Sequence, residues 1–250
     1  EDFNPTMGIQ KKDVARSLRF KALIKDFDQI SYEGFKTIKS DLTFQIPMYT
    51  RNIEDLDLMR NLDTEKYPQI KNEIEALKRW NGNATIDNRE ASIFSLAIQY
   101  FLKVTNKQST TDYNKNLGEK VFVKALKFAH SHIKKYFKGE IPKLGDLQKL
   151  VRGKKELPLW GIPETICQMY TIPHKKGKLK GDLGESFIML VQYDKEGPQI
   201  ETINCYGSSN HPGNPHYDDQ MEMFVNQKYK KMTLNKEEVF KAATRIYHPQ

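Results

Sequence analysis

The spacing of apolar residues changes near residue 150, and this change constrains the fold more than any other feature of the sequence. Before it, apolar residues recur every three or four positions, as at Ile70, Ile74 and Leu77, which is typical of helices with one buried face. After it, residues 187–193 and 200–206 are short β-prone runs separated by a Gly-Pro pair, as in a hairpin. We therefore predict an α+β chain, helix-rich over its first two-thirds and followed by antiparallel strands.

Residues 1–150 are accordingly expected to form a mainly helical region, and residues 151–250 an antiparallel β region with a short C-terminal helix. Ser, Thr, Asp and Asn favour helix starts because their side chains accept hydrogen bonds from free backbone N–H groups. The expected helices begin near Val14, at Ser31, at Thr64 for residues 65–80, after Asn88 for residues 89–104, near Leu117 for residues 117–137, at Asp146 for a short helix ending near Val151, and at Asn235. Residues 105–116 are polar and are expected to form a surface loop.

Charge and composition exclude several classes of protein. The 250 residues carry a formal net charge of +8, which favours acidic partners without deciding the fold. The densest basic run, residues 174–180, has no interleaved aromatic residues and matches no nucleic-acid-binding motif, so we expect no nucleic-acid partner. The longest apolar run, residues 187–191, is far shorter than the roughly 20 residues that a membrane span requires. We therefore expect no insertion into a membrane.

Familiar catalytic motifs are missing: the sequence contains no GxSxG, P-loop, GxGxxG or HExxH pattern. His130 and His132 are two positions apart and do not share a helical face, so we expect one to be packed and the other exposed. His216 and Asp219 suit a role in fastening a Gly-rich loop better than a metal site. Periodicity and motifs alone therefore disclose no reaction.

A few isolated residues leave alternatives open. Cys167 and Cys205 could pair in a disulfide, but two buried free thiols are the favoured interpretation. Trp160 either lines an acyl pocket or packs in the core, and core packing is slightly favoured.

Several local phrases are nevertheless distinctive, and they follow one another in a characteristic order. They cover residues 16–19 (RSLR), 77–82 (LKRWNG), 88–91 (NREA), 144–153 (LGDLQKLVRG), 184–187 (GESF), 206–220 (YGSSNHPGNPHYDDQ) and 233–239 (TLNKEEV). Together they resemble the C-terminal part of the β-subunit of the penicillin amidase (penicillin acylase) family, which includes acyl-homoserine-lactone acylases. The resemblance implies part of an αββα sandwich of an N-terminal nucleophile hydrolase, with residues 1–150 and 151–250 both belonging to one larger domain.

The resemblance also implies an activity, hydrolysis of the N-acyl amide bond of a small molecule, without a redox or nucleotide cofactor. Some relatives hold a structural Ca²⁺, whose ligands are expected in parts outside this chain, so no metal ligand is expected among these residues. In this family an exported precursor cuts itself, and the new N-terminal Ser of the β chain attacks the amide carbonyl. A periplasmic or secreted location is therefore implied. Glu1 is no nucleophile, and Asn4 abuts Pro5, unlike the oxyanion-hole Asn of the family. The nucleophile is thus expected outside this chain, which should be inactive without the α-subunit and the N-terminal part of the β-subunit.

The site residues are likewise implied by the resemblance. Arg16 matches a family Arg that lies near the nucleophile and helps to hold the oxyanion and substrate, with Arg19 as the alternative choice. Glu185 matches a region in which some relatives place a carboxylate that orients a His. The alternative to the enzyme interpretation is a non-catalytic binding or assembly fragment.

Overall fold

A computed structural model describes residues 13–50, 53–105, 116–195 and 197–246 of the protein. The chain separates into two compact units, Glu1–Gly184 and Glu185–Gln250. The beginning of the sequence, with Glu1, Asn4 and Pro5, lies outside the described residues, as does most of the expected loop at residues 105–116.

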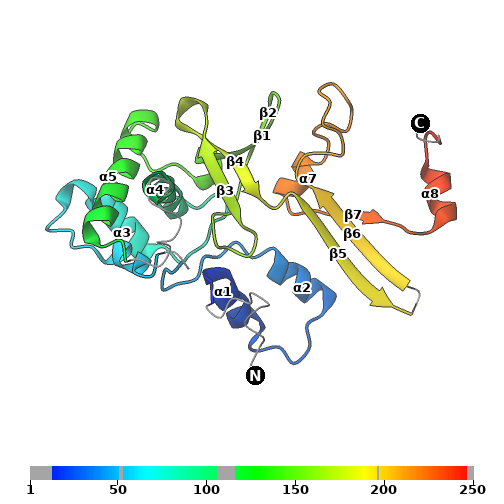
Figure 1. Ribbon diagram of the computed structural model, residues 1–250, viewed down its shortest axis with the longest axis horizontal. Helices are drawn as coiled ribbons and strands as arrows, with labels where there is room; N and C mark the ends of the chain where they lie inside the picture. The colour runs from blue at the N-terminus through cyan, green and yellow to red at the C-terminus, as the bar shows by residue number, and fades with distance from the viewer. Residues whose placement is uncertain (1–12, 51–52, 106–115, 196, 247–250) are drawn as a thin grey trace. The chain divides into compact units, whose positions relative to one another are not determined.

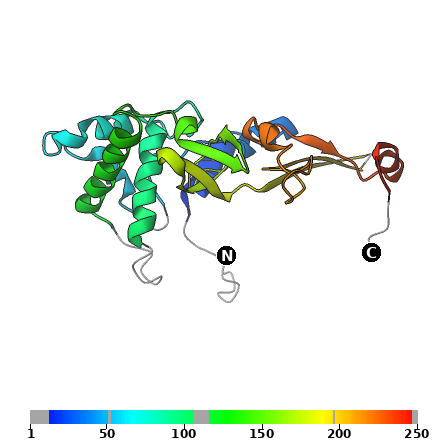
Figure 2. The same ribbon diagram turned by 90° about the horizontal axis from the view of Figure 1, so that it is seen from above.

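The first unit contains most of the helical structure (Figure 1). Its helices are α1 (Ala15–Ile24), α2 (Tyr32–Lys39), α3 (Lys71–Arg79), α4 (Glu90–Thr105), α5 (Glu119–Tyr136) and the single turn α6 (Leu144–Leu147), with 3₁₀ turns η2 (Leu56–Asn61), η3 (Pro68–Ile70) and η4 (Lys175–Gly177). Helices α4 and α5 run beside each other, as Figures 1 and 2 both show. They bury their facing apolar stripes, as the helical spacing in the sequence predicted.

Three aromatic side chains from separate segments meet in the core of this unit. The ring centroid of Phe94 on α4 lies 4.9 Å from that of Phe44 and 5.1 Å from that of Trp80, which follows α3. All three are buried, and Phe94 is fully inaccessible. Such tilted aromatic pairs add to the gain from burial, so this cluster ties α3 and α4 to the preceding loop.

The local starts of several helices follow the expected chemistry. The Ser31 side chain accepts a hydrogen bond from the Gly34 backbone N–H at 3.1 Å, which confirms the predicted cap of α2. Helix α4 begins at Glu90, one residue after the predicted start at Arg89, and the Asn88 side chain accepts a hydrogen bond from Ala91 N at 2.7 Å.

The expected helix over residues 65–80 is wrong in its first part. Asp63, rather than Thr64, accepts a hydrogen bond from the Glu65 backbone N–H, at 2.9 Å, in a local turn. Pro68 then disfavours a helical conformation for the residue before it, so regular α-helix starts only at Lys71.

A four-stranded sheet completes the first unit. Its strands are β1 (Gln148–Arg152), β2 (Lys155–Pro158), β3 (Met169–Pro173) and β4 (Leu179–Gly184), in the order β2-β1-β4-β3. Strands β1 and β4 pair in parallel, whereas the other neighbours are antiparallel. The expected helix from Asp146 to Val151 is therefore wrong: helix α6 ends at Leu147, and β1 starts at the next residue because it pairs with two other strands.

The second unit is built on a hairpin of β5 (Phe187–Asp194) and β6 (Gly197–Asn204), extended by β7 (Lys230–Met232). This antiparallel hairpin confirms the prediction from the sequence. Helices α7 (Met221–Val225) and α8 (Lys236–Ala242) complete the unit, and the Asn235 side chain caps α8 by accepting a hydrogen bond from Glu238 N at 3.1 Å.

The two faces of the hairpin differ in burial. Ile188 and Leu190 are buried on one face, whereas Phe187, Met189 and Tyr193 on the other are 53%, 51% and 81% exposed. Helix α8 contributes no buried residue.

The chain is thus an α+β fold with mostly antiparallel pairing, as predicted. Cys167 and Cys205 are buried free thiols, which confirms the favoured interpretation. None of the described helices is both long and apolar enough to cross a membrane.

Candidate functional site

Helix α1 carries both arginines that the resemblance singles out, and its own residues fix its start. The Val14 backbone N–H donates to Ser17 Oγ at 2.9 Å, and the Ser17 hydroxyl lies 3.0 Å from Asp13 Oδ1. Lys21 Nζ donates to the same carboxylate, at 2.8 Å from Oδ2, and lowers the pKa of Asp13 together with Ser17. Ala15 is fully buried in the core and anchors the inner side of the helix.

Arg19 is committed to a structural ion pair. Its Nε and one terminal nitrogen donate to the two carboxylate oxygens of Asp41 at 3.0 and 2.7 Å, a forked geometry that raises the pKa of Arg19. The side chains of Arg19 and Asp41 are only 26% and 14% exposed. Asp41 also accepts from the Thr43 backbone N–H at 3.0 Å, and its own carbonyl accepts from Cys167 N at 3.2 Å. This network holds α1 against residues 41–43, which lead into the core.

Arg16 lies one helical turn before Arg19 and is half-buried. Among the described residues, the structure gives the Arg16 guanidinium no hydrogen bond or ion pair. Of the two arginines, Arg16 is therefore the one whose donors remain available to a bound group, on a helix that Arg19 keeps in place. Its catalytic role stays a prediction.

Glu185 opens the second unit, between the end of β4 and the start of β5, and is half-buried. Arg16 belongs to the first unit, so the structure places the two predicted site residues in different units. The role of Glu185 also stays a prediction.

The Gly-rich loop after β6 is fastened by the residues expected to do so. His216 Nδ1 lies 2.7 Å from Asp219 Oδ2, and the His216 carbonyl accepts from Ser209 N at 3.0 Å. Gly207 passes so close to this carbonyl that a Cβ atom would lie 2.2 Å from it. The described residues contain no group of three His, Cys, Asp or Glu side chains placed to hold a metal ion.

The structure also shows the surroundings of Trp160, His130 and His132. Trp160 is 3% exposed, which fits core packing. The expectation that one of His130 and His132 is packed and the other exposed is wrong, because both are half-buried with separate partners. His132 Nε2 lies 2.7 Å from the Gly177 carbonyl oxygen, and burial lowers the pKa of His132. His130 instead joins Glu73.

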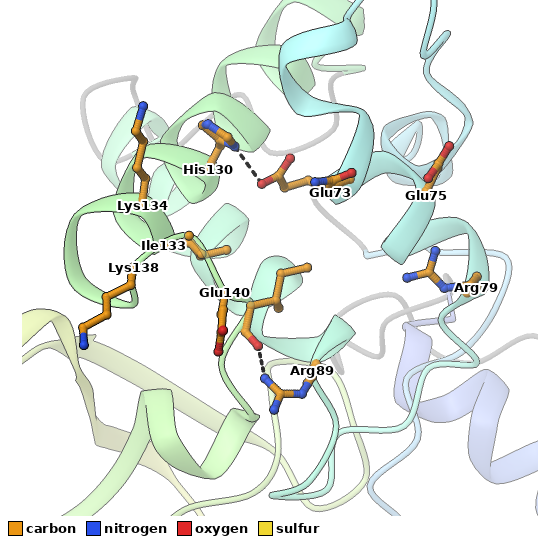
Figure 3. A pocket seen from close by; sticks show the side chains of 12 residues that line it. Glu73, Glu75, Arg79, Arg89, His130, Ile133, Lys134, Lys138 and Glu140 are labelled. Carbon is orange, nitrogen blue, oxygen red and sulfur yellow. Dashed lines mark hydrogen bonds and ion pairs between the residues drawn. The ribbon is translucent and has the colours of Figure 1, made fainter.

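Glu73 and His130 line a pocket that the sequence analysis did not predict (Figure 3). It has a volume of about 680 Å³ and lies between α3, α5 and residues 139–141. His130 Nδ1 on α5 is 2.9 Å from Glu73 Oε1 on α3, and Glu73 is buried. A signal was present: Glu73 falls three positions after Ile70, on the apolar side of the helix, where an unpaired carboxylate is costly.

Comparison with known proteins identifies the family. The family model described as Penicillin amidase matches residues 2–241. The chain is 27% identical over 100 residues to the acyl-homoserine lactone acylase PvdQ of Pseudomonas savastanoi pv. phaseolicola, covering 39% of this chain and 13% of that protein. It is 20% identical over 200 residues to PvdQ of Pseudomonas fluorescens Pf0-1, covering 73% and 26%.

A solved structure of the thermostable penicillin G acylase from Alcaligenes faecalis matches with a TM-score of 0.34 and 13% identity, covering 78% of this chain and 45% of that one. The chain thus spans less than half the length of each of these proteins. The match of the family model over nearly all of the chain shows that the chain belongs to the penicillin amidase family.

Proposed function

We propose that this chain is the C-terminal portion of an N-terminal nucleophile amidohydrolase that cleaves N-acyl amide bonds. The observation that carries the proposal is the family match over residues 2–241. The relatives are named as acyl-homoserine lactone acylases, and such a substrate contains an N-acyl amide. In the proposed protein the nucleophilic Ser belongs to a part outside this chain.

In the proposed reaction the Ser hydroxyl attacks the amide carbonyl and loses its proton to a general base, the Ser α-amino group acting through water. As the tetrahedral intermediate collapses to an acyl-enzyme, the protonated base gives its proton to the leaving nitrogen and the amine departs. Water then hydrolyses the ester, which releases the carboxylic acid and restores the Ser hydroxyl. Arg16 stabilises the negative charge that develops on the carbonyl oxygen. A guanidinium suits this task because it remains charged and presents several donors in a fixed plane.

The geometry of α1 supports this assignment of Arg16. The fork between Arg19 and Asp41 holds the helix, so the backbone of Arg16, one turn earlier, has a defined position. A fixed backbone reduces the freedom that is lost when the side chain meets the substrate. Glu185 is proposed as a positioning carboxylate that orients a basic side chain supplied by another part of the protein.

The exposed face of the β5–β6 hairpin supports assembly with further polypeptide. Phe187, Met189 and Tyr193 present apolar surface that burial would stabilise. In the proposed protein, the α-subunit and the N-terminal part of the β-subunit cover such surface and complete an αββα sandwich. The same observation favours the second candidate function, a non-catalytic assembly fragment. The enzyme proposal also includes a periplasmic or secreted location for the protein.

Hydrolysis measurements separate the two candidates. The complete protein is incubated with a chromogenic N-acyl anilide carrying an apolar acyl chain, alongside a variant in which the N-terminal Ser of the β-subunit is changed to Ala. The enzyme proposal expects release of the anilide by the unchanged protein and negligible release by the variant. Equal and negligible turnover in both would leave the assembly fragment as the better account.

A further inference from the structure

The pocket between α3 and α5 contains a charged group whose hydrogen bonding is incomplete. The Glu73 side chain is 5% exposed, and its Oε1 is engaged by His130 Nδ1 at 2.9 Å. Within the described part of the chain, no donor reaches the buried Oε2 of the same carboxylate. An unsatisfied buried carboxylate oxygen is costly, and the last torsion of a glutamate is soft, so either oxygen can turn to meet a donor. Glu73 is therefore a strong acceptor in the wall of the pocket.

Positive groups line the same pocket away from Glu73. Arg79 is 63% exposed, its closest ion-pair contact to Glu90 is a loose 4.0 Å, and in Figure 3 it extends toward the middle of the pocket. Arg89 donates one N–H to the Ile141 carbonyl, which leaves its other donors for a ligand. Guanidinium groups match the planar geometry of a carboxylate, so this side suits an anionic group.

The remaining lining sets the size and polarity of the ligand. Ile133 and Ile141 contribute apolar surface to the lining. The volume of about 680 Å³ falls within the range of small-molecule sites. Lys134 and Lys138 also line the pocket, but their side chains extend outward in Figure 3.

We propose that this pocket binds a small α-amino acid with an apolar side chain. The ammonium group donates to Glu73, the carboxylate meets Arg79 and Arg89, and the apolar side chain packs on Ile133 and Ile141. A simple cation would be repelled by the arginines, and a simple anion by the buried carboxylate. A zwitterion satisfies both sides at once. This proposal does not depend on the acylase activity.

Isothermal titration calorimetry on the complete protein tests the proposal with three probes. L-leucine carries both charges, N-acetyl-L-leucine lacks the ammonium, and L-leucinamide lacks the carboxylate. We expect saturable binding of leucine, and about tenfold or greater loss of affinity for each of the other probes, because each lacks one of the two charged groups that the pocket binds. Binding of all three probes with equal affinity, or no saturable heat with millimolar leucine, would overturn the proposal.

Matched variants locate the binding at this pocket. Glu73→Gln removes the buried charge while keeping the size of the side chain, and should weaken leucine binding about tenfold or more. Glu33→Gln on α2, whose side chain is 78% exposed and does not line the pocket, is the control and should leave the affinity unchanged. Equal affinities of the unchanged protein and Glu73→Gln would also overturn the proposal. If Glu73→Gln lowers the thermal midpoint too far for titration, the three probes on the unchanged protein still decide.

Discussion

Separate replacement of the two arginines of α1 distinguishes a structural from a catalytic role. Arg19→Ala removes a forked ion pair whose side chains are 26% and 14% exposed, and leaves Asp41 with the Thr43 N–H as its described side-chain partner. Exposed ion pairs contribute about 0–1 kcal/mol, and a hydrogen bond to a buried charge about 1.5–3 kcal/mol. For this partly buried pair we therefore expect a loss of about 1–3 kcal/mol.

Arg16→Ala removes a half-buried side chain without a described partner, so its effect on stability should stay within about 0.5 kcal/mol. If Arg16 stabilises the oxyanion, kcat/KM for an N-acyl anilide should fall about 10²–10³-fold. Arg16→Lys is the matched control, because it keeps the charge but loses the planar fork, and should recover part of the activity.

Thermal unfolding and hydrolysis are measured on the same preparations of the complete protein. A change of 1 kcal/mol shifts the unfolding midpoint of a chain of roughly 150–250 residues by about 2–4 °C, and a longer protein shifts by less, so the two variants are compared side by side with the unchanged protein. The reasoning fails if Arg16→Ala retains full activity. It also fails if Arg19→Ala leaves the midpoint unchanged, because the fork would then not hold α1.

Further predictions concern stability. Contacts with Lys175, then Lys178 and His174, lower the pKa of Glu156 from 4.5 to about 2. This carboxylate therefore stabilises the fold above pH 4.5, and its contribution is lost as the pH falls toward 2. Glu156→Gln should flatten this part of a pH–stability profile. Asn88→Ala removes the cap of α4 and should cost about 1 kcal/mol in a urea titration. Phe94→Ala should cost about 3–5 kcal/mol, because it opens a cavity between Phe44 and Trp80, whereas a loss below 1 kcal/mol would refute the packing described for this cluster.

Local chemistry explains which parts of the fold were predictable. Ser31 and Asn235 were identified as caps because the hydrogen bond that each makes reaches only three residues along the chain. The β5–β6 hairpin followed from adjacent β-prone runs and a short turn.

Long-range pairing explains what was missed. Residues 148–152 have helical spacing, but they form β1 because they pair with β2 and, in parallel, with β4 some thirty positions later. No local pattern encodes that second pairing. Pro68 was a readable signal against a continuous helix from residue 65, and it was outweighed by the apolar spacing that follows it.

The candidate site also contains residues that the sequence predicted and residues that it did not. Arg16 and Glu185 came from ordered sequence phrases, and no periodicity would have selected them. The pocket at Glu73 and His130 depends on a contact between residues 57 positions apart, so the sequence offered only the carboxylate on an apolar helix face. A buried charge on such a face indicates a partner without identifying it.

Product identification with an N-acyl homoserine lactone tests the central claim most directly. The complete protein is incubated with the substrate, and the products are separated and identified by mass spectrometry. Cleavage of the amide predicts a free fatty acid and intact homoserine lactone in equal amounts, with neither formed by the Ser-to-Ala variant. A ring-opened N-acyl homoserine as the sole product would contradict the account, because the lactone rather than the amide would then be the bond that the protein hydrolyses.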